Sequence, residues 1–177
     1  LAEVIRRLRA EVPGVSFAVE VTDGREMRHE ASYPVSQPDG RVRAVEELED
    51  LFSAPAVKLL ARASNHDPQT FVKLVGAALQ GLAEATHSSY SGLVEISAVG
   101  VTKAAGLAWF CDRHGVSANE VVAFGDMPND LPMLTWAGQA VAVANADPAV
   151  RDVADQVTPS NDEDGVAVYL ERYFPPA

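Results

Sequence analysis

The segment VVAFGDMPNDLPML, residues 121–134, runs from an apolar stretch straight into a cluster of polar side chains. The stretch VVAFG has the length and composition of a strand that is buried on both faces, as strands of parallel sheets are. A helix is predicted to follow over residues 128–137, with proline in its first turn. A buried strand, an acidic loop and a helix in this order indicate a parallel α/β fold, in which ligands bind beyond the carboxyl ends of the strands.

Helices and strands alternate strictly on both sides of this segment. Upstream, a helix is predicted over residues 102–114. Downstream, AVAVA (140–144) and QVT (156–158) are predicted strands, with a helix between them and a last helix over residues 163–174. Because this alternation is typical of doubly wound sheets, residues 99–177 are predicted to form part of a Rossmann-like parallel sheet. Trp109 and Trp136 are expected in its core.

The first hundred residues follow a different plan. The stretch VSFAVEV (15–21) alternates as a half-buried strand does, and Pro68 opens a helix that Asp67 caps. The expected elements are a helix over 1–12, strands at 15–21 and 27–31, a helix over 42–52, a strand at 56–61, the Pro68 helix, and two strands around residues 91–92. Helices on one side of a mainly antiparallel sheet form an α+β layer, so residues 1–98 are predicted to be a separate α+β domain.

Composition limits the classes of partner. The 177 residues carry 14 Lys and Arg against 25 Asp and Glu, a net charge of −11 that repels nucleic acid. No apolar run reaches the length of about 18 residues that a membrane helix needs. The N-terminal segment is charged and amphipathic, unlike a signal peptide. We therefore expect a cytoplasmic protein with no nucleic-acid or membrane partner.

The polar residues after VVAFG have two interpretations. Asp126, Asn129 and Asp130 offer oxygen ligands at the carboxyl end of a strand, which suits Mg²⁺ because that ion takes one or two carboxylates plus water and substrate phosphate. Alternatively, Asp126 caps the next helix, and Asp130 is a favourable acid in its first turn. The loop by itself does not decide between a metal site and a helix cap.

Lys103 favours the functional interpretation. It opens a helix, where a cation opposes the helix dipole and gains nothing locally. A helix that runs back antiparallel to the strands begins at the edge where the next strand ends, so Lys103 is predicted to lie near Asp126. There a lysine can neutralise phosphate oxygens. An exposed lysine on a solvated face is the alternative.

Residues 100–174 strongly resemble the C-terminal half of haloacid dehalogenase superfamily hydrolases, of the Cof-like branch with an inserted cap. The matching elements, in order, are Lys103, Gly125-Asp126, Asn129-Asp130, Ala137-Gly138, Asn145-Ala146, and Asn161 with Gly165-Val166. The first hundred residues resemble the α+β cap, of the C2 type, in the order of their elements alone.

The resemblance implies Mg²⁺-dependent hydrolysis of small phosphomonoesters, such as sugar phosphates, by way of an aspartyl-phosphate. Phosphosugar mutases share the same arrangement of cap and core. Asp126 and Asp130 would be the metal ligands, Asp130 directly or through water. Lys103 would hold the nucleophile and the phosphoryl oxygens, and Asn129 would contact phosphate or a metal-bound water. The loop 158–165 would border the site on the side of the cap.

One departure from the family pattern is decisive. The family's first motif, Asp-x-Asp after an N-terminal apolar strand, carries the nucleophile and the general acid, and here the one Asp-x-Asp lies in the polar loop at Asp162 and Asp164. The chain also opens at Leu1 inside a helical pattern. We therefore expect a fragment of a longer protein, inactive alone. The open edge of its VVAFG strand would be covered by a missing segment or a second copy.

Two other classes of protein share some of these features. A phospho-receiver domain uses similar residues, but its acidic pair precedes its lysine, whereas Lys103 precedes Asp126. A non-catalytic small-ligand-binding or interaction module stays open, with the α+β half binding the ligand and the acidic loop serving the fold. The four histidines lack the spacing of a metal site.

Overall fold

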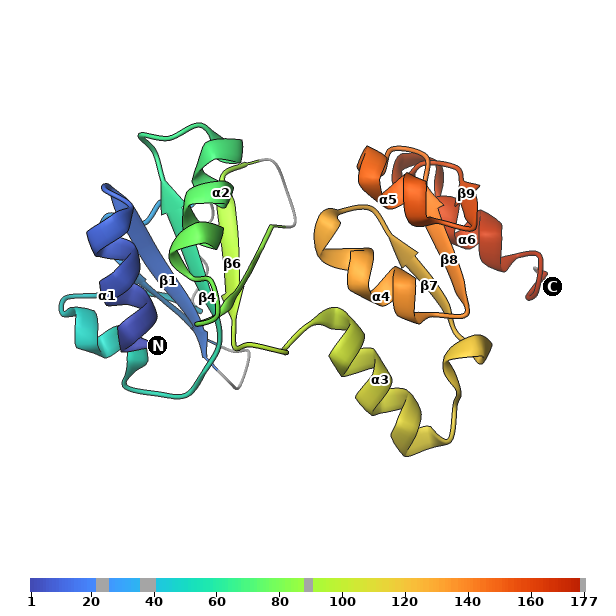
Figure 1. The fold of residues 1–177 in the computed structure, drawn as a ribbon, viewed down its shortest axis with the longest axis horizontal. Coiled ribbons are helices and arrows are strands. Elements are labelled where there is room, and N and C mark those ends of the chain that lie inside the picture. Colours follow the sequence, from blue (N-terminus) through green and yellow to red (C-terminus); the bar gives the residue numbers. More distant parts are fainter. Residues whose placement is uncertain (22–25, 36–40, 88–90, 176–177) are drawn as a thin grey trace. The chain divides into compact units, whose positions relative to one another are not determined.

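The computed structural model describes residues 1–21, 26–35, 41–87 and 91–175. The predicted turn at residues 22–24 and part of the predicted strand before Ser91 lie outside them. The chain forms two compact units, unit 1 (Leu1–Gly100) and unit 2 (Val101–Ala177) (Figure 1). In the part of the chain that the structure describes, no helix is long and apolar enough to cross a membrane.

Unit 1 is built on a six-stranded sheet with the order β3-β2-β1-β4-β6-β5. The strands are β1 (Val15–Val21), β2 (Met27–Glu30), β3 (Val42–Val45), β4 (Ala56–Ala63), β5 (Glu84–Thr86) and β6 (Leu93–Ser97). Neighbouring strands pair antiparallel except β2 and β3, which are parallel. The mainly antiparallel sheet is therefore present, with one parallel pair at its edge.

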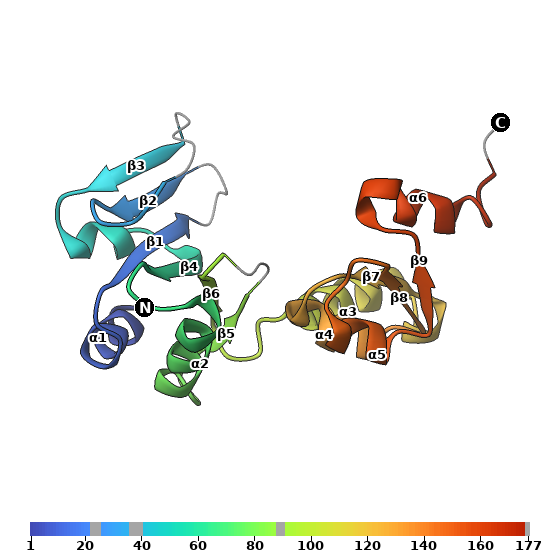
Figure 2. The same ribbon diagram turned by 90° about the horizontal axis from the view of Figure 1, so that it is seen from above.

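Two helices, α1 (Ala2–Glu11) and α2 (Pro68–Ala78), lie on the same side of this sheet (Figure 2). Their apolar stripes, with Ile5, Leu8 and Phe71, pack on alternate residues of the strands, such as Phe17. Asp67 caps α2, its side chain accepting a hydrogen bond from the backbone N–H of Thr70 at 3.0 Å. Burial of these side chains anchors both helices to one face of the sheet. Within the described residues of unit 1, no helix lies on the other face, which is called the helix-free face below.

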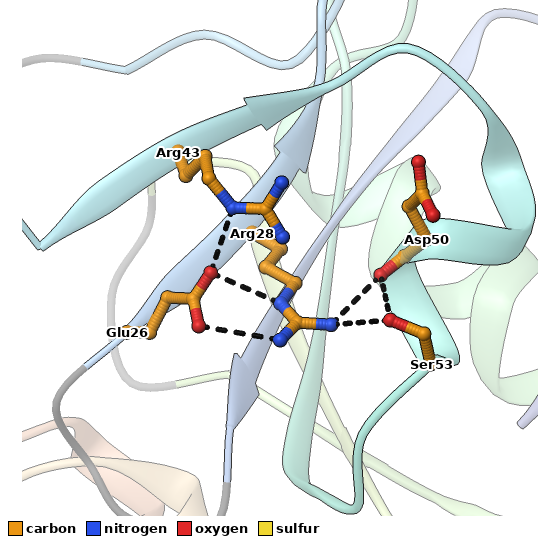
Figure 3. A network of polar contacts seen from close by, with 5 residues as sticks. All are labelled: Glu26, Arg28, Arg43, Asp50 and Ser53. Carbon is orange, nitrogen blue, oxygen red and sulfur yellow. Dashed lines mark hydrogen bonds and ion pairs between the residues drawn. The ribbon is translucent and has the colours of Figure 1, made fainter.

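The helix predicted over residues 42–52 is wrong. β3 occupies its first part, and a 3-10 helix, η1 (Leu48–Phe52), follows. A polar network shows why (Figure 3): Glu26 binds both Arg28 of β2 and Arg43 of β3, and Arg28 also donates to the Asp50 carbonyl and the Ser53 hydroxyl. The segment therefore finds hydrogen-bond partners in strand β2 and in these side chains without forming a helix. Tertiary pairing overrides local helix propensity here.

Unit 2 is a parallel α/β layer, as predicted. Its strands β7 (Val122–Gly125), β8 (Gln139–Val143) and β9 (Gln156–Thr158) are all parallel, in that order. The helices are α3 (Lys103–His114), α4 (Leu131–Trp136), α5 (Pro148–Val153) and α6 (Gly165–Leu170), with 3-10 turns η2 (Ala118–Glu120), η3 (Pro128–Asp130) and η4 (Asn161–Glu163). The predicted helices over 128–137 and 163–174 are thus shorter, each preceded by a 3-10 turn.

Small side chains let the layers of unit 2 approach. Ala123 of β7 and Ala142 of β8 pack against Leu134 of α4 and Val150 of α5. Helix α6 lies on the other face of the sheet (Figure 2). There the rings of Phe124 and Tyr169 meet edge to face with centroids 5.3 Å apart. The central strand β8 is therefore covered on both faces, with Val141 and Ala142 fully buried, while Val157 of β9 stays exposed.

Trp109 is not in this core, contrary to the prediction from sequence. Its side chain on α3 is 61% exposed, and the Arg113 guanidinium lies over its ring at 4.4 Å from the centroid. The neighbouring Phe110 is 54% exposed. α3 thus presents aromatic side chains on a face that nothing in the described part of the chain covers.

Candidate functional site

The candidate site lies at the carboxyl edge of the unit 2 sheet. β7 ends at Gly125, Asp126 follows, and the chain turns through η3 into α4. The backbone N–H of Asp147, in the loop after β8, donates to the Asp126 carbonyl at 2.8 Å. Two strand-end loops are therefore tied together at the edge where a ligand of a parallel sheet binds.

Lys103 reaches this loop, as the sequence predicts. Its ammonium nitrogen lies 2.5 Å from Oδ1 of Asp130. Thr102 begins the helix by accepting a hydrogen bond from the backbone N–H of Ala105 at 3.1 Å, which fixes Lys103 at its first position. The Lys103 side chain is half-exposed while that of Asp130 is buried, so the cation remains accessible to a ligand.

Asp130 organises the loop from inside. Its second oxygen, Oδ2, accepts hydrogen bonds from the backbone N–H groups of Asp126 at 3.0 Å and of Met127 at 3.2 Å. Burial acts to raise the pKa of Asp130, but the bonds from Lys103 and from these two N–H groups outweigh it and hold the pKa below its usual value. Asp130 is therefore a carboxylate whose two oxygens are engaged by the chain.

Asp126 is exposed at the same edge, and its environment is less favourable to negative charge. Partial burial of its carboxyl raises the pKa, and so do the charge and hydrogen bonding of Asp130, while Lys103 acts in the opposite direction. Two carboxylates and one lysine leave a net negative charge at this edge. A bound cation would relieve that repulsion.

Asn129 adds an oxygen with no partner. Its Oδ1 atom is buried and accepts no hydrogen bond from the described residues, and a buried acceptor in this state costs free energy. No group of three His, Cys, Asp or Glu side chains that could hold a metal occurs in the described ranges. Asp126 as a carboxylate ligand, with the Asn129 oxygen able to accept from a metal-bound water, thus fits a hard ion such as Mg²⁺, which needs few protein ligands, and does not fit a site closed by protein alone.

Asn145 and Asn161, two of the elements on which the family resemblance rests, lie at the same edge. The side-chain amide of Asn145, after β8, donates to Oδ1 of Asn161, and the backbone N–H of Asn161 donates to Oδ1 of Asn145 at 3.2 Å. Ser160 and Glu163 close a capping box beside them. Each of the two residues closely follows the carboxyl end of a parallel strand, β8 or β9, which explains why they meet at this edge.

Comparison with known proteins gives a consistent family. The model of haloacid dehalogenase-like hydrolases matches residues 15–170. The chain is 45% identical, over 82 residues, to the 5-amino-6-(5-phospho-D-ribitylamino)uracil phosphatase YitU of Bacillus subtilis. The match covers 46% of this chain and 30% of that relative.

Two solved structures share the fold over almost the whole chain. The structure of SMU.1108c from Streptococcus mutans superposes with a TM-score of 0.81 at 22% identity, covering 99% of this chain and 67% of that one. A haloacid dehalogenase-like hydrolase from Bacteroides thetaiotaomicron superposes with a TM-score of 0.72 at 27% identity, covering 98% of this chain and 66% of that one. The chain thus spans about two thirds of these structural relatives.

Proposed function

The chain belongs to the haloacid dehalogenase-like hydrolase family, in its Cof-like branch, and on this premise we propose that unit 2 is the metal-binding and phosphate-binding part of a phosphatase site. The observation that carries the proposal is the ion pair of Lys103 with Asp130, 2.5 Å long, beside the exposed Asp126. A helix start and a strand end bring a cation and two carboxylates to one sheet edge, where local structure alone gives no reason for them to meet.

Each residue has a role in this proposal. Lys103 binds phosphoryl oxygens with its exposed ammonium while Asp130 fixes its position. Asn129 would donate to a phosphate oxygen through its side-chain NH₂ group, or accept through its buried Oδ1 atom from a metal-bound water. Asp126 would be the direct ligand of Mg²⁺, and Asp130, whose oxygens are engaged within the chain, would support the metal site through water. When bound, the ion would supply positive charge that stabilises the phosphoryl oxygens.

The nucleophile belongs, on this proposal, to a segment outside the 177 residues. No Asp-x-Asp follows an apolar strand in the sequence, and β7 pairs with β8 while its other edge has no partner strand among the described residues. A parallel strand added at that edge would end beside Asp126, because carboxyl ends of parallel strands meet at one edge. A carboxylate there would form the aspartyl-phosphate, and a second acid would protonate the leaving oxygen. A second copy of the chain is the other candidate to cover the edge.

The substrate class that we propose is small phosphomonoesters, sugar phosphates among them. The name of the Bacillus relative, a phosphatase of a phosphoribityl compound, supports this class. Unit 1 would serve as the cap that selects among such substrates, with the domain boundary proposed after residue 98, close to the end of the compact unit at Gly100. We propose the cytoplasm as the location of the protein.

The experiment compares the 177-residue chain with a longer protein that contains it. Turnover of an aryl phosphate is measured with Mg²⁺ for both, and for Asp126→Asn and Lys103→Met in the longer protein. We expect no turnover by the chain alone and a loss of about a hundredfold or more in each variant. Asp152→Asn, which removes an exposed carboxylate from α5, is the matched control and should stay close to the parent activity.

Two results would count against the proposal. Turnover by the chain alone that disappears in Asp126→Asn would refute the need for a second segment. A longer protein that is inactive on a broad panel of phosphates would favour the non-catalytic ligand-binding module. One observation supports this second candidate function, the binding of a small ligand without catalysis. Unit 1 contains a cavity of about 620 Å³ lined mostly by apolar residues such as Val4, Leu59 and Ile96.

A further inference from the structure

The helix-free face of the unit 1 sheet carries an arginine, Arg62, that forms no ion pair with a carboxylate among the described residues. Arg62 lies on β4, an interior strand, two residues from Leu60 and opposite Ser16 of β1. Side chains two apart on a strand, and those directly paired across strands, share a face. Leu60 packs with Ala18 and Tyr33, away from the residues that contact α1 and α2. Arg62 therefore belongs to the face opposite the helices.

Most cationic side chains of unit 1 form ion pairs among the described residues, whereas Arg62 and the exposed Lys73 do not. On the same face, Lys58 pairs with Glu95 at 2.7 Å. Elsewhere on the unit the pairs are Arg6 with Glu3, Arg7 with Glu11, Arg9 with Glu30, and both Arg28 and Arg43 with Glu26. Within the described ranges no carboxylate pairs with Arg62, although the protein carries an excess of acids. An unneutralised cation on a partly covered face has free capacity for an anion.

The contacts of Arg62 orient its guanidinium and leave donors unused. One terminal nitrogen donates to the Ser91 carbonyl at 3.1 Å and the other to the Ser91 hydroxyl at 3.4 Å. A guanidinium has five N–H donors in a fixed plane, so these two bonds hold the fork and leave others available. Such a preorganised fork matches the two oxygens of a carboxylate or a phosphate better than a lysine does.

Tyr33 places a hydroxyl donor beside this fork. Its side chain is buried against Ala18 and Leu60. Burial raises the pKa of Tyr33, the negative charge of Glu20 acts in the same direction, and the hydrogen bond and charge of Arg62 only partly offset them. The phenol therefore stays protonated at neutral pH and can donate to an acceptor.

We propose that Arg62 and the Tyr33 hydroxyl form an anion-binding site on the helix-free face of unit 1, which takes the carboxylate or phosphate group of a small molecule. The guanidinium supplies charge and paired N–H donors, and the phenol supplies one further donor from a desolvated position. The site rests on unit 1 alone and does not depend on the proposed phosphatase activity.

The test is a titration of the whole chain with sodium phosphate and, separately, with sodium malonate at constant ionic strength, followed by NMR of the Arg62 side-chain N–H and the Tyr33 ring. We expect saturable shifts in the millimolar range. Since a charge-assisted hydrogen bond is worth about 1.5–3 kcal/mol, Arg62→Met should weaken binding about tenfold or more. The arm that binds more tightly identifies the anionic group.

Matched variants distinguish binding at this site from general electrostatic attraction. Lys73→Met removes one exposed positive charge from α2, on the other side of the sheet, and should change the affinity less than about twofold. Tyr33→Phe keeps the packed ring and removes the hydroxyl, so it tests the site even if Arg62→Met unfolds. Lys103→Met in unit 2 should leave the Arg62 shifts unchanged, which distinguishes this anion from one bound at the phosphatase site.

Three outcomes would overturn the proposal. The first is absence of saturable shifts with either anion. The second is equal weakening by Lys73→Met and Arg62→Met, which would mean that the net charge of the unit attracts the anion. The third is binding that neither Arg62→Met nor Tyr33→Phe alters, in which case Arg62 serves only to hold the turn at Ser91.

Discussion

Asp130 is the residue on which the geometry of the unit 2 site depends most, and Asp130→Asn measures that dependence. The amide keeps the shape of the side chain but has one oxygen in place of two. If that oxygen faces the two backbone N–H groups, the NH₂ group faces the Lys103 ammonium, donor against donor. The opposite orientation is worse, because the NH₂ group then faces both backbone donors.

The expected cost follows from these contacts. Two hydrogen bonds change from charge-assisted to neutral, a loss of about 1 kcal/mol each. The ion pair adds only about 0–1 kcal/mol, because Lys103 is half-exposed and can turn into water. Asp130→Asn should therefore lower the free energy of unfolding by about 2–3 kcal/mol at neutral pH. Asp130→Ala, which leaves both backbone donors without a partner, should cost about 3–5 kcal/mol.

The pH dependence gives the prediction a second signature. The pKa of Asp130 is lower in the folded chain than in the unfolded one, so its contribution is fully present above the unfolded value of about 3.9. It is lost as the pH falls from that value through the lowered folded pKa. The difference in unfolding free energy between the parent and Asp130→Asn should thus shrink with acid below about pH 4.

Urea unfolding followed by tryptophan fluorescence is the assay, because both tryptophans, Trp109 and Trp136, lie in unit 2. Asp152→Asn, the exposed control on α5, should change the free energy of unfolding by less than about 0.5 kcal/mol. If Asp130→Asn costs no more than this control, or if its cost does not change with acid, then Asp130 does not hold the loop together.

Two further predictions concern unit 2. Lys103→Met should raise the pKa of Asp130 while lowering stability by only about 1 kcal/mol, and carboxyl-carbon NMR titration checks it; an unchanged pKa would contradict the ion pair. Gly138→Ala should destabilise by about 1–3 kcal/mol, because a Cβ there would collide with the backbone of Asn119. Gly106→Ala, in open space on α3, should instead stabilise by about 0.5–1 kcal/mol. Urea unfolding measures both variants, and equal effects on the free energy of unfolding would contradict the packing described for Gly138.

Sequence patterns predicted unit 2 better than the edge of unit 1 for a physical reason. The strands of unit 2 are buried on both faces, so their apolar runs stand out, and β8 lies where the run at residues 140–144 placed it. In the segment 42–52, Val42 and Val45 are three residues apart, a spacing that fits a helix and not the alternation of a strand with one buried face. Its structure depends on pairing with β2 and on Arg28, contacts that local periodicity does not contain.

The same distinction applies to the candidate site. The meeting of Lys103 with Asp130 follows from topology, since α3 begins at the edge where β7 ends, and sequence reasoning could reach it. The division of work between the two acids could not be reached in that way. In the sequence, Asp126 and Asp130 are two aspartates of the same loop with no visible difference in role. In the structure, the Asp130 side chain turns inward to the loop backbone while Asp126 stays exposed. Only the folded loop decides which carboxylate is free for a cation.

The exposed aromatic face of α3 and the unpaired edge of β7 have a common explanation in the proposed second segment. Val122 on that edge is 37% exposed, and Trp109 and Phe110 are more exposed still. Parallel strands are normally covered on both faces and flanked by other strands, because open edges and apolar faces promote association. A strand added to β7 would pair the free backbone groups of that edge. The residues flanking the added strand could then bury the exposed apolar side chains. The same addition would bring a carboxylate to Asp126 and Lys103, so the requirements of folding and of phosphate chemistry point to one edge of the sheet.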